Sequence, residues 1–188
     1  LASMRQGSQV ATDLSPTAGS PTSFDGTQGQ FDVIASNKSG RDHRAKGKLI
    51  YRGIRYLQFD NGEYFVKAGA DAPENMLAYG EFDQTANKKD FAEHVKHYNS
   101  GDPTWKNGLG KGIIGAVNYL SDQGMNVFSF LPMNITGDGK DVWPYIGSSS
   151  SQFNRFDVSK LAQWEILFDH ADKKGMYLHF KTQETEND

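Results

Sequence analysis

The chain has 188 residues, of which 37% are hydrophobic and 12% aromatic, and its formal net charge is −3. The length is sufficient for one domain with a sizeable core, and the composition is that of a globular chain rather than a disordered one. The charge argues against nucleic acid or an acidic membrane surface as a partner, no apolar run approaches the roughly 20 residues of a membrane span, and the lack of cysteine excludes disulfides and thiolate chemistry.

Short apolar pieces separated by Gly, Ser, Pro and Thr occupy residues 1–47. This composition is typical of the last strands of a β-sandwich domain followed by a linker. We expect strands at Leu1–Met4, Val10–Ala11 and Phe31–Ile34, with a loop at Ser15–Gly29. The chain starts at Leu1 without a visible signal peptide and stops directly after an expected strand, so we expect the natural protein to be longer.

Antiparallel strands are predicted after residue 47. Leu49–Tyr51 and Ile54–Phe59 form a predicted hairpin, and Asn61–Gly62 marks a second turn because this dipeptide accepts positive φ at low cost. Glu63–Gly69 is the next expected strand. Within the long excursion that follows, the apolar spacing predicts a helix over Lys88–Tyr98.

Two matching units of helix, glycine, methionine and strand end the chain. The first has a helix at Lys111–Gln123 and a strand at Met125–Pro132; the second has a helix at Val158–Lys174 and a strand at Met176–Thr182. Asp157 is positioned to cap the second helix. Alternating helices and strands favour parallel pairing, so we predict an α/β fold in which residues 48–188 form the first three strands of a (β/α)₈ TIM-type barrel. No dinucleotide or phosphate-loop motif follows a strand, and no cofactor is predicted.

Strand alternation predicts which side chains face the barrel axis. In the last strand Met176, Leu178 and Phe180 should face the helices. In the middle strand Val127 and Leu131 should face the helices. The inward-facing set would then comprise Tyr177, His179, Lys181 and Gln183 of the last strand; Phe128, Phe130, Pro132 and Asn134 of the middle strand; and Lys67, Gly69 and Asp71 of the first.

The candidate substrate-binding residues lie near the carboxyl ends of the strands or in the loops that follow, where barrel enzymes place their sites. They are Asp71, Glu74, Asn75, Trp105, Asn134, Trp143, His179, Lys181 and Gln183. Each has a structural alternative: a core histidine, an ion-paired lysine, a loop-shaping carboxylate, or a tryptophan that anchors a loop instead of stacking on a sugar.

Glycoside hydrolysis needs two carboxylates, and Glu184 and Glu186 are the candidate pair. In an extended chain they lie on one face about 7 Å apart, which is admissible but not specific. The alternative is a solvated or substrate-orienting chain end. Asp138 and Asp141 raise the alternative of a calcium site, but they lack the pattern of an EF-hand loop, and no metal is predicted.

Four stretches resemble a known family: Gly29–Leu49, YFVKAGADAPENMLAYGEFD at Tyr64–Asp83, GMNVFSFLPMNITGDGKDVWPYI at Gly124–Ile146, and Arg155–Asp188. The family consists of bacterial proteins with an N-terminal immunoglobulin-like domain of unknown function followed by an apiosidase-like glycoside-hydrolase barrel. The resemblance implies a polysaccharide or glycoside substrate and a secreted or periplasmic location. It implies catalytic carboxylates after strands four and seven, and so assigns none to this chain.

Three functional hypotheses remain open. The first is a glycoside hydrolase that is incomplete and lacks its catalytic carboxylates. The second is a non-catalytic carbohydrate-binding or structural module, and the third is an unrelated α/β enzyme that uses His179 and Glu184 as acid and base. An unfinished parallel sheet exposes an edge, so self-association through that edge is also expected.

Overall fold

The computed structural model describes residues 5–6, 19–70, 75–85, 89–134, 139–147 and 155–182. The chain divides into two compact units, Leu1–Ser36 and Asn37–Asp188. The first unit pairs β1 (Arg5–Gln6) with β2 (Ser20–Pro21) in antiparallel fashion. None of the helices in the described ranges is both long enough and apolar enough to cross a membrane.

The strand predicted at Phe31–Ile34 is wrong. This segment has no strand, and Phe31, Val33 and Ile34 are 88%, 89% and 83% exposed. Apolar residues favour a strand only where a neighbouring strand supplies hydrogen bonds and burial, and no strand in the described ranges pairs with this segment. Conversely, β2 falls within the predicted loop Ser15–Gly29, whereas Leu1–Met4 and Val10–Ala11 lie outside the described residues.

The second unit begins with a 3₁₀ turn, η1 (His43–Ala45), and a small antiparallel sheet. Its strands are β3 (Leu49–Tyr51), β4 (Leu57–Phe59) and β5 (Tyr64–Phe65), paired in that order. The predicted hairpin and second turn are therefore confirmed, although β4 and β5 are shorter than expected. Gly62 has φ +91°, a conformation that glycine adopts without strain.

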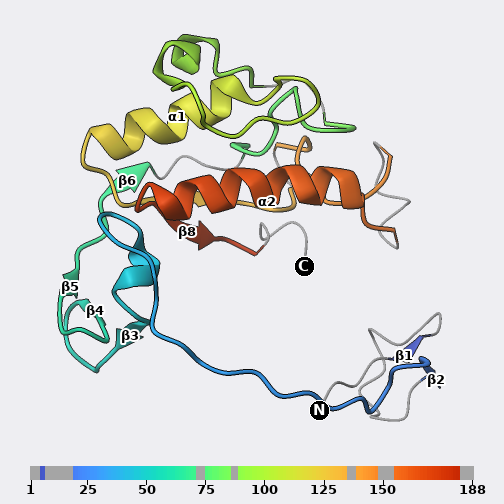
Figure 1. Ribbon diagram of the computed structural model, residues 1–188. Coiled ribbons are helices and arrows are strands. Elements are labelled where there is room, and N and C mark those ends of the chain that lie inside the picture. Colours follow the sequence, from blue (N-terminus) through green and yellow to red (C-terminus); the bar gives the residue numbers. More distant parts are fainter. Residues whose placement is uncertain are drawn as a thin grey trace. The chain divides into compact units, whose positions relative to one another are not determined.

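A parallel sheet with two covering helices forms the body of the second unit (Figure 1). Its strands are β6 (Gly69–Ala70), β7 (Val127–Phe130) and β8 (Tyr177–Phe180), in that order. The connections run through α1 (Lys111–Asp122) and α2 (Val158–Lys173). The two predicted helix–strand units are confirmed, and the fold is mixed α/β.

The residues at the helix termini act as predicted. The Asp157 side chain accepts a hydrogen bond from Lys160 N at 3.0 Å and so caps the first turn of α2. Gly124 and Gly175 follow the two helices with φ values of +80° and +72°, so each supplies the left-handed residue that lets the chain turn into the next strand. The capping pattern therefore sets where each strand starts.

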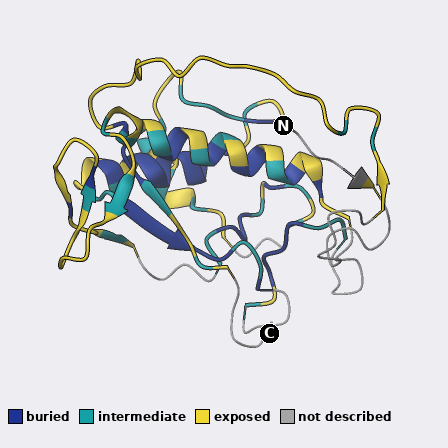
Figure 2. Cartoon of the chain, turned by 90° about the horizontal axis from the view of Figure 1, so that it is seen from below, coloured by how far each residue is buried: buried dark blue, intermediate teal, exposed yellow. Residues whose placement is uncertain are grey.

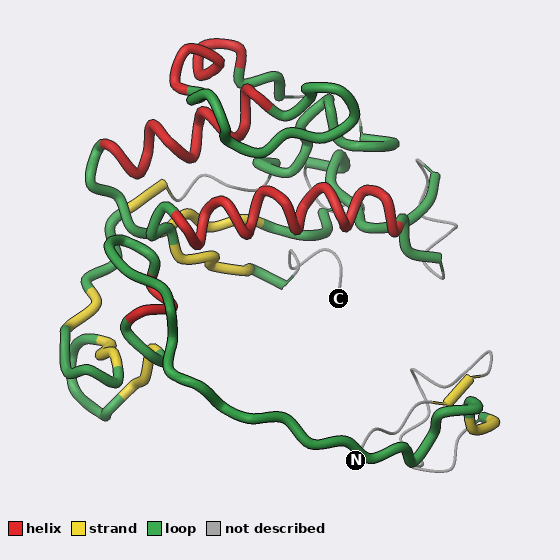
Figure 3. Tube along the Cα trace, viewed as in Figure 1, coloured by secondary structure: helices red, strands yellow, loops and turns green. Residues whose placement is uncertain are grey.

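The helix predicted at Lys88–Tyr98 is instead a short 3₁₀ helix, η2 (Ala92–His97). Phe91 precedes it in the left-handed region, with φ +50°, which breaks the regular helical path. Figure 3 shows this element inside a long loop-rich connection that leads to α1. Phe91 and Tyr98 are half-buried and Val95 is 48% exposed, so the apolar spacing does not mark a buried helical face.

Buried and exposed residues alternate along the helices, as an amphipathic pattern requires (Figure 2). The main core joins both helices to β7: it contains Ile113 and Val117 of α1, Trp164 and Leu167 of α2, and Phe130 of the strand. Both helices therefore cover the same face of the parallel sheet.

The predicted facing of the middle strand is wrong. Phe128 and Phe130 are fully buried against the helices, whereas Val127 packs with Phe59 and Phe65 on the opposite face. The register explains the reversal, because Phe130 is aligned with Phe180 and residues aligned across a sheet share a face. The assignment of Leu178 and Phe180 to the helix side agrees with this register.

Close packing between η2 and α1 depends on a glycine. A Cβ atom added at Gly115 would collide with the carbonyl oxygen of His94. We expect Gly115→Ala to lower the free energy of unfolding by about 1–3 kcal/mol, since overpacking against the backbone outweighs the better helix propensity of alanine. Urea unfolding measures this change. Gly29→Ala is the matched control, because nothing lies within 4 Å of its added Cβ; an equal effect at both positions would contradict the close-packing argument.

Candidate functional site

Three polar side chains meet on the face of the parallel sheet that the helices leave uncovered. Ser129 Oγ lies 2.8 Å from His179 Nδ1, and Lys67 Nζ lies 3.2 Å from Ser129 Oγ and 3.1 Å from His179 Nδ1. We call Lys67, Ser129 and His179 the inner-face cluster. Ser129 is aligned with His179 in the register of β7 and β8, so the pair is fixed by strand pairing itself.

The segment that carries Lys67 is held in place by one asparagine. Asn126 accepts a hydrogen bond from Ala68 N on its side-chain oxygen and donates one from its side-chain nitrogen to Val66 O, each at 2.8 Å. Its backbone N–H also donates to Ala68 O at 2.8 Å. The Asn126 side chain thus acts as an additional peptide unit next to the chain before β6 and fixes the backbone on both sides of Lys67.

Four rings pack together on the same face at the amino ends of β7 and β8. Phe59, Phe65 and Tyr177 contact one another, and the His43 ring lies 4.7 Å from the ring of Tyr177 and 5.6 Å from that of Phe59. Burial lowers the pKa of His43, which favours a neutral imidazole. We call Phe59, Phe65, Tyr177 and His43 the aromatic plug. The face is therefore apolar at this end and polar at the level of Ser129 and His179.

The inner-face cluster can donate hydrogen bonds more readily than it can perform nucleophilic chemistry. Ser129 is only 1% exposed, so its hydroxyl supports Lys67 and His179 and does not present a nucleophile to a substrate. Lys67 and His179 are exposed. Lys181 follows two residues after His179, and its backbone N–H continues the ladder by donating to Phe130 O at 2.9 Å.

The loop after β7 is closed by a buried amide. The Asn134 side-chain oxygen accepts hydrogen bonds from Asp141 N at 3.0 Å and Val142 N at 2.7 Å, and its nitrogen donates to Asp141 Oδ1 at 2.9 Å. Asn134 is fully buried. In this conformation Asn134, a predicted substrate-binding residue, shapes the loop, and its role in sugar binding stays a prediction.

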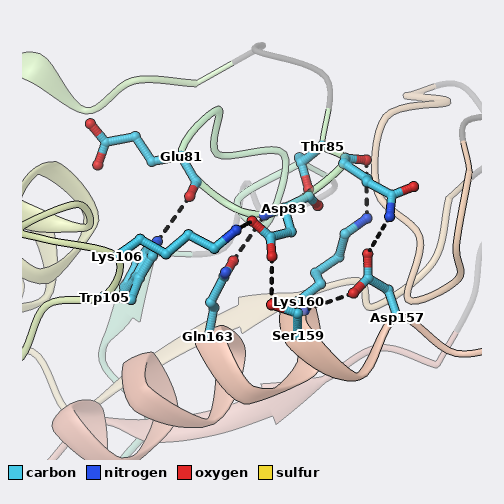
Figure 4. A network of polar contacts seen from close by, with 10 residues as sticks. Glu81, Asp83, Thr85, Trp105, Lys106, Asp157, Ser159, Lys160 and Gln163 are labelled. Atoms are coloured by element: carbon cyan, nitrogen blue, oxygen red, sulfur yellow. Dashed lines mark hydrogen bonds and ion pairs between the residues drawn. The ribbon is translucent and has the colours of Figure 1, made fainter.

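A second polar network, shown in Figure 4, fixes the loops above the amino end of α2. Asp83 accepts hydrogen bonds from Lys106 and Ser159, and its backbone N–H donates to Gln163 at 2.8 Å. Burial alone would raise the pKa of Asp83, but the hydrogen bonds from Lys106, Ser159 and Gln163 outweigh it and lower that pKa to about 2. Asp83 thus remains ionised and joins three segments of the unit.

A buried lysine completes this network. Lys160 Nζ donates to Gln84 O at 3.2 Å and to Trp143 O at 3.1 Å, and it lies 5.0 Å from the centre of the Trp143 ring. Burial lowers its pKa to about 8, although Asp157 and Asp83 oppose the shift. The amine therefore connects two loops through their carbonyl groups.

Both predicted sugar-stacking tryptophans are buried. Trp105 is 6% exposed, stacks on Phe82 at 5.1 Å and donates to Glu81 O at 2.9 Å (Figure 4). Trp143 is 5% exposed and donates to Gly147 O. Neither ring has a free face in this conformation, which favours the loop-anchoring alternative; stacking on a sugar stays a prediction.

The remaining predicted site residues are not brought together. Asn75 lines a cleft of about 250 Å³ with Met76, His94 and Tyr119, and of the inner-face cluster only Ser129 also lines this cleft. The others, Asp71, Glu74, Gln183, Glu184 and Glu186, lie outside the described residues, as does Asp138. Within the described ranges, no group of three or more His, Asp or Glu side chains is placed to hold a metal ion.

Sequence reasoning placed His179 and Lys67 on the inward side but did not single out Ser129 or Lys67 as site residues. The available signal was one hydroxyl within the otherwise apolar strand Val127–Phe130, at the position aligned with His179.

Comparison with protein-family models, with curated proteins and with solved structures found no match for this chain.

Proposed function

We propose that this chain forms part of a (β/α)₈ barrel of the glycoside-hydrolase type and that its inner face binds carbohydrate. One observation carries the proposal: both connecting helices lie on one face of a parallel sheet whose strands follow chain order. The wall of a barrel has this arrangement, and so does one half of a doubly wound sheet, but no dinucleotide or phosphate-loop motif follows any strand, which favours the barrel. The opposite face is then the barrel interior.

The distribution of polarity on that interior face supports the same proposal. The aromatic plug fills the end at which the strands begin, represented by Val127 and Tyr177. Ser129 and His179 lie two residues further along these strands, toward the carboxyl ends where barrel enzymes bind substrates. A sugar, with its many hydroxyl groups, would be bound there by hydrogen-bond donors and acceptors.

A polysaccharide panel tests this proposal directly. We expect the chain to bind at least one glycan in affinity electrophoresis, and we expect His179→Ala to weaken that binding roughly tenfold, the effect of losing one or two hydrogen bonds. Val158→Ala, at an exposed position on α2, is the control and should bind like the parent chain. Binding that is absent, or that His179→Ala leaves unchanged, would count against a carbohydrate site on this face.

A non-catalytic binding module is the second candidate function, and one observation favours it. Among the described residues, the inner-face cluster has no carboxylate among its hydrogen-bond or ion-pair partners, although hydrolysis requires two. Measuring reducing ends released from the bound glycan separates the two functions. Release supports the hydrolase, and binding without release supports the module.

A further inference from the structure

Lys67 bears a positive charge that only neutral groups contact within the described part of the chain. Its Nζ atom has two hydrogen-bonding neighbours, Ser129 Oγ and His179 Nδ1. The ammonium group has three N–H donors, so at least one of them lacks an acceptor among the described residues. An exposed lysine that is held on a sheet face by two neutral groups is suited to bind an anion.

The arrangement of Ser129 and His179 gives the cluster a further hydrogen-bond donor. A neutral histidine offers a single lone pair at Nδ1, and both Ser129 and Lys67 lie within reach of it, at 2.8 Å and 3.1 Å. Lys67 has only hydrogen-bond donors, so its contact with His179 Nδ1 requires that this nitrogen accepts, and the ring hydrogen of His179 then lies on Nε2. The exposed side of the cluster therefore presents N–H groups of Lys67 and His179.

The cluster is also built on a rigid base. Ser129 is buried in the central strand, and Asn126 fixes the backbone on both sides of Lys67 through two side-chain hydrogen bonds of 2.8 Å. Donors that are fixed before binding lose less conformational entropy when a ligand arrives.

We infer that the inner-face cluster is an oxyanion subsite that accepts the carboxylate or sulfate group of an acidic sugar. This inference rests on the proposed carbohydrate-binding function and narrows its substrate class. Charge-assisted hydrogen bonds from Lys67 and His179 would bind the anionic oxygens, while the rest of the inner face contacts the sugar ring.

Calorimetric titration of the whole chain with glucuronate, with glucose as the neutral counterpart and with sodium sulfate tests the inference. We expect glucuronate to bind at least tenfold more tightly than glucose. Lys67→Met should weaken glucuronate binding roughly 10- to 100-fold, the usual effect of removing a hydrogen bond to a charged group, and should weaken glucose binding by a smaller factor. Lys48→Met, at another exposed lysine, is the matched control. Circular dichroism verifies that both variants fold.

The outcomes separate this inference from the function on which it rests. If glucose and glucuronate bind equally, or if Lys67→Met has no effect on glucuronate, the oxyanion subsite is refuted while carbohydrate binding stands. If sulfate binds in a Lys67-dependent manner and neither sugar does, the anion site stands and the proposed function fails. If glucuronate binds with the expected dependence on Lys67 and sulfate competes with it, the inference is supported in full.

Discussion

Replacing Phe130 by alanine should lower the free energy of unfolding by about 3–5 kcal/mol, the range measured for large aromatic residues in closed cores. Phe130 is fully buried, and its ring lies 5.1 Å from that of Phe168 and 4.4 Å from that of Phe180. Alanine would leave a cavity between the sheet and α2 at this fully buried position. Chemical denaturation monitored by tryptophan fluorescence measures the change.

Phe31→Ala provides the control for this prediction. Phe31 is 88% exposed, so its removal should change the unfolding free energy by no more than about 0.5 kcal/mol. The pair of variants also tests the facing of β7. If Phe130 pointed toward the barrel axis and away from the helices, as strand alternation in the sequence suggested, truncating it in this chain would have a much smaller effect.

Acid should destabilise the chain through His170. This residue is 3% exposed, and its Nε2 lies 2.9 Å from Asn118 Oδ1, so the neutral ring donates a hydrogen bond there. Asn118 in turn donates to Asp102 and to His97 O. Burial lowers the pKa of His170 from 6.5 to about 4, and only Asp102 opposes the shift.

The sign of the effect follows from proton binding. Between pH 6.5 and about 4 the unfolded chain binds a proton at this residue and the folded chain does not. The contribution of His170 to stability is therefore complete above pH 6.5 and is lost as the pH falls toward 4, a loss on the order of 3 kcal/mol. Urea unfolding at a series of pH values across this window measures it.

His170→Gln identifies the source of the acid effect. Glutamine keeps an N–H donor for Asn118 but does not titrate, so we expect the loss of stability between pH 6.5 and about 4 to become smaller by about 3 kcal/mol. An unchanged acid profile in His170→Gln would show that other groups cause the destabilisation.

The helices and strands of the second unit could be predicted because several local signals agree. In α2, an aspartate cap, an apolar stripe and a terminal glycine all specify the same element. The facing of β7 could not be predicted in the same way. Val127, Phe128 and Phe130 are all apolar, so the strand has no alternation from which to read its faces, and only its register with β8 settles them.

The candidate site was predictable only in part, for a related reason. His179 alternates with Leu178 and Phe180 in a strand with one polar and one apolar side, so its direction could be inferred. The burial of Trp105 depends on contacts with Glu81 and Phe82, more than 20 residues earlier in the chain, and no local pattern encodes such contacts.

The aromatic plug has a consequence for how this unit can be exchanged between proteins. The plug includes His43, and Arg41 donates hydrogen bonds to the carbonyl groups of Lys174 and Met125, so the segment before the hairpin holds both helix–strand junctions. If a different N-terminal segment were joined to this unit at Asn37, the aromatic plug would stay intact. A junction at Lys48 would remove His43 together with Arg41 and leave Phe59, Phe65 and Tyr177 without the ring that packs against them.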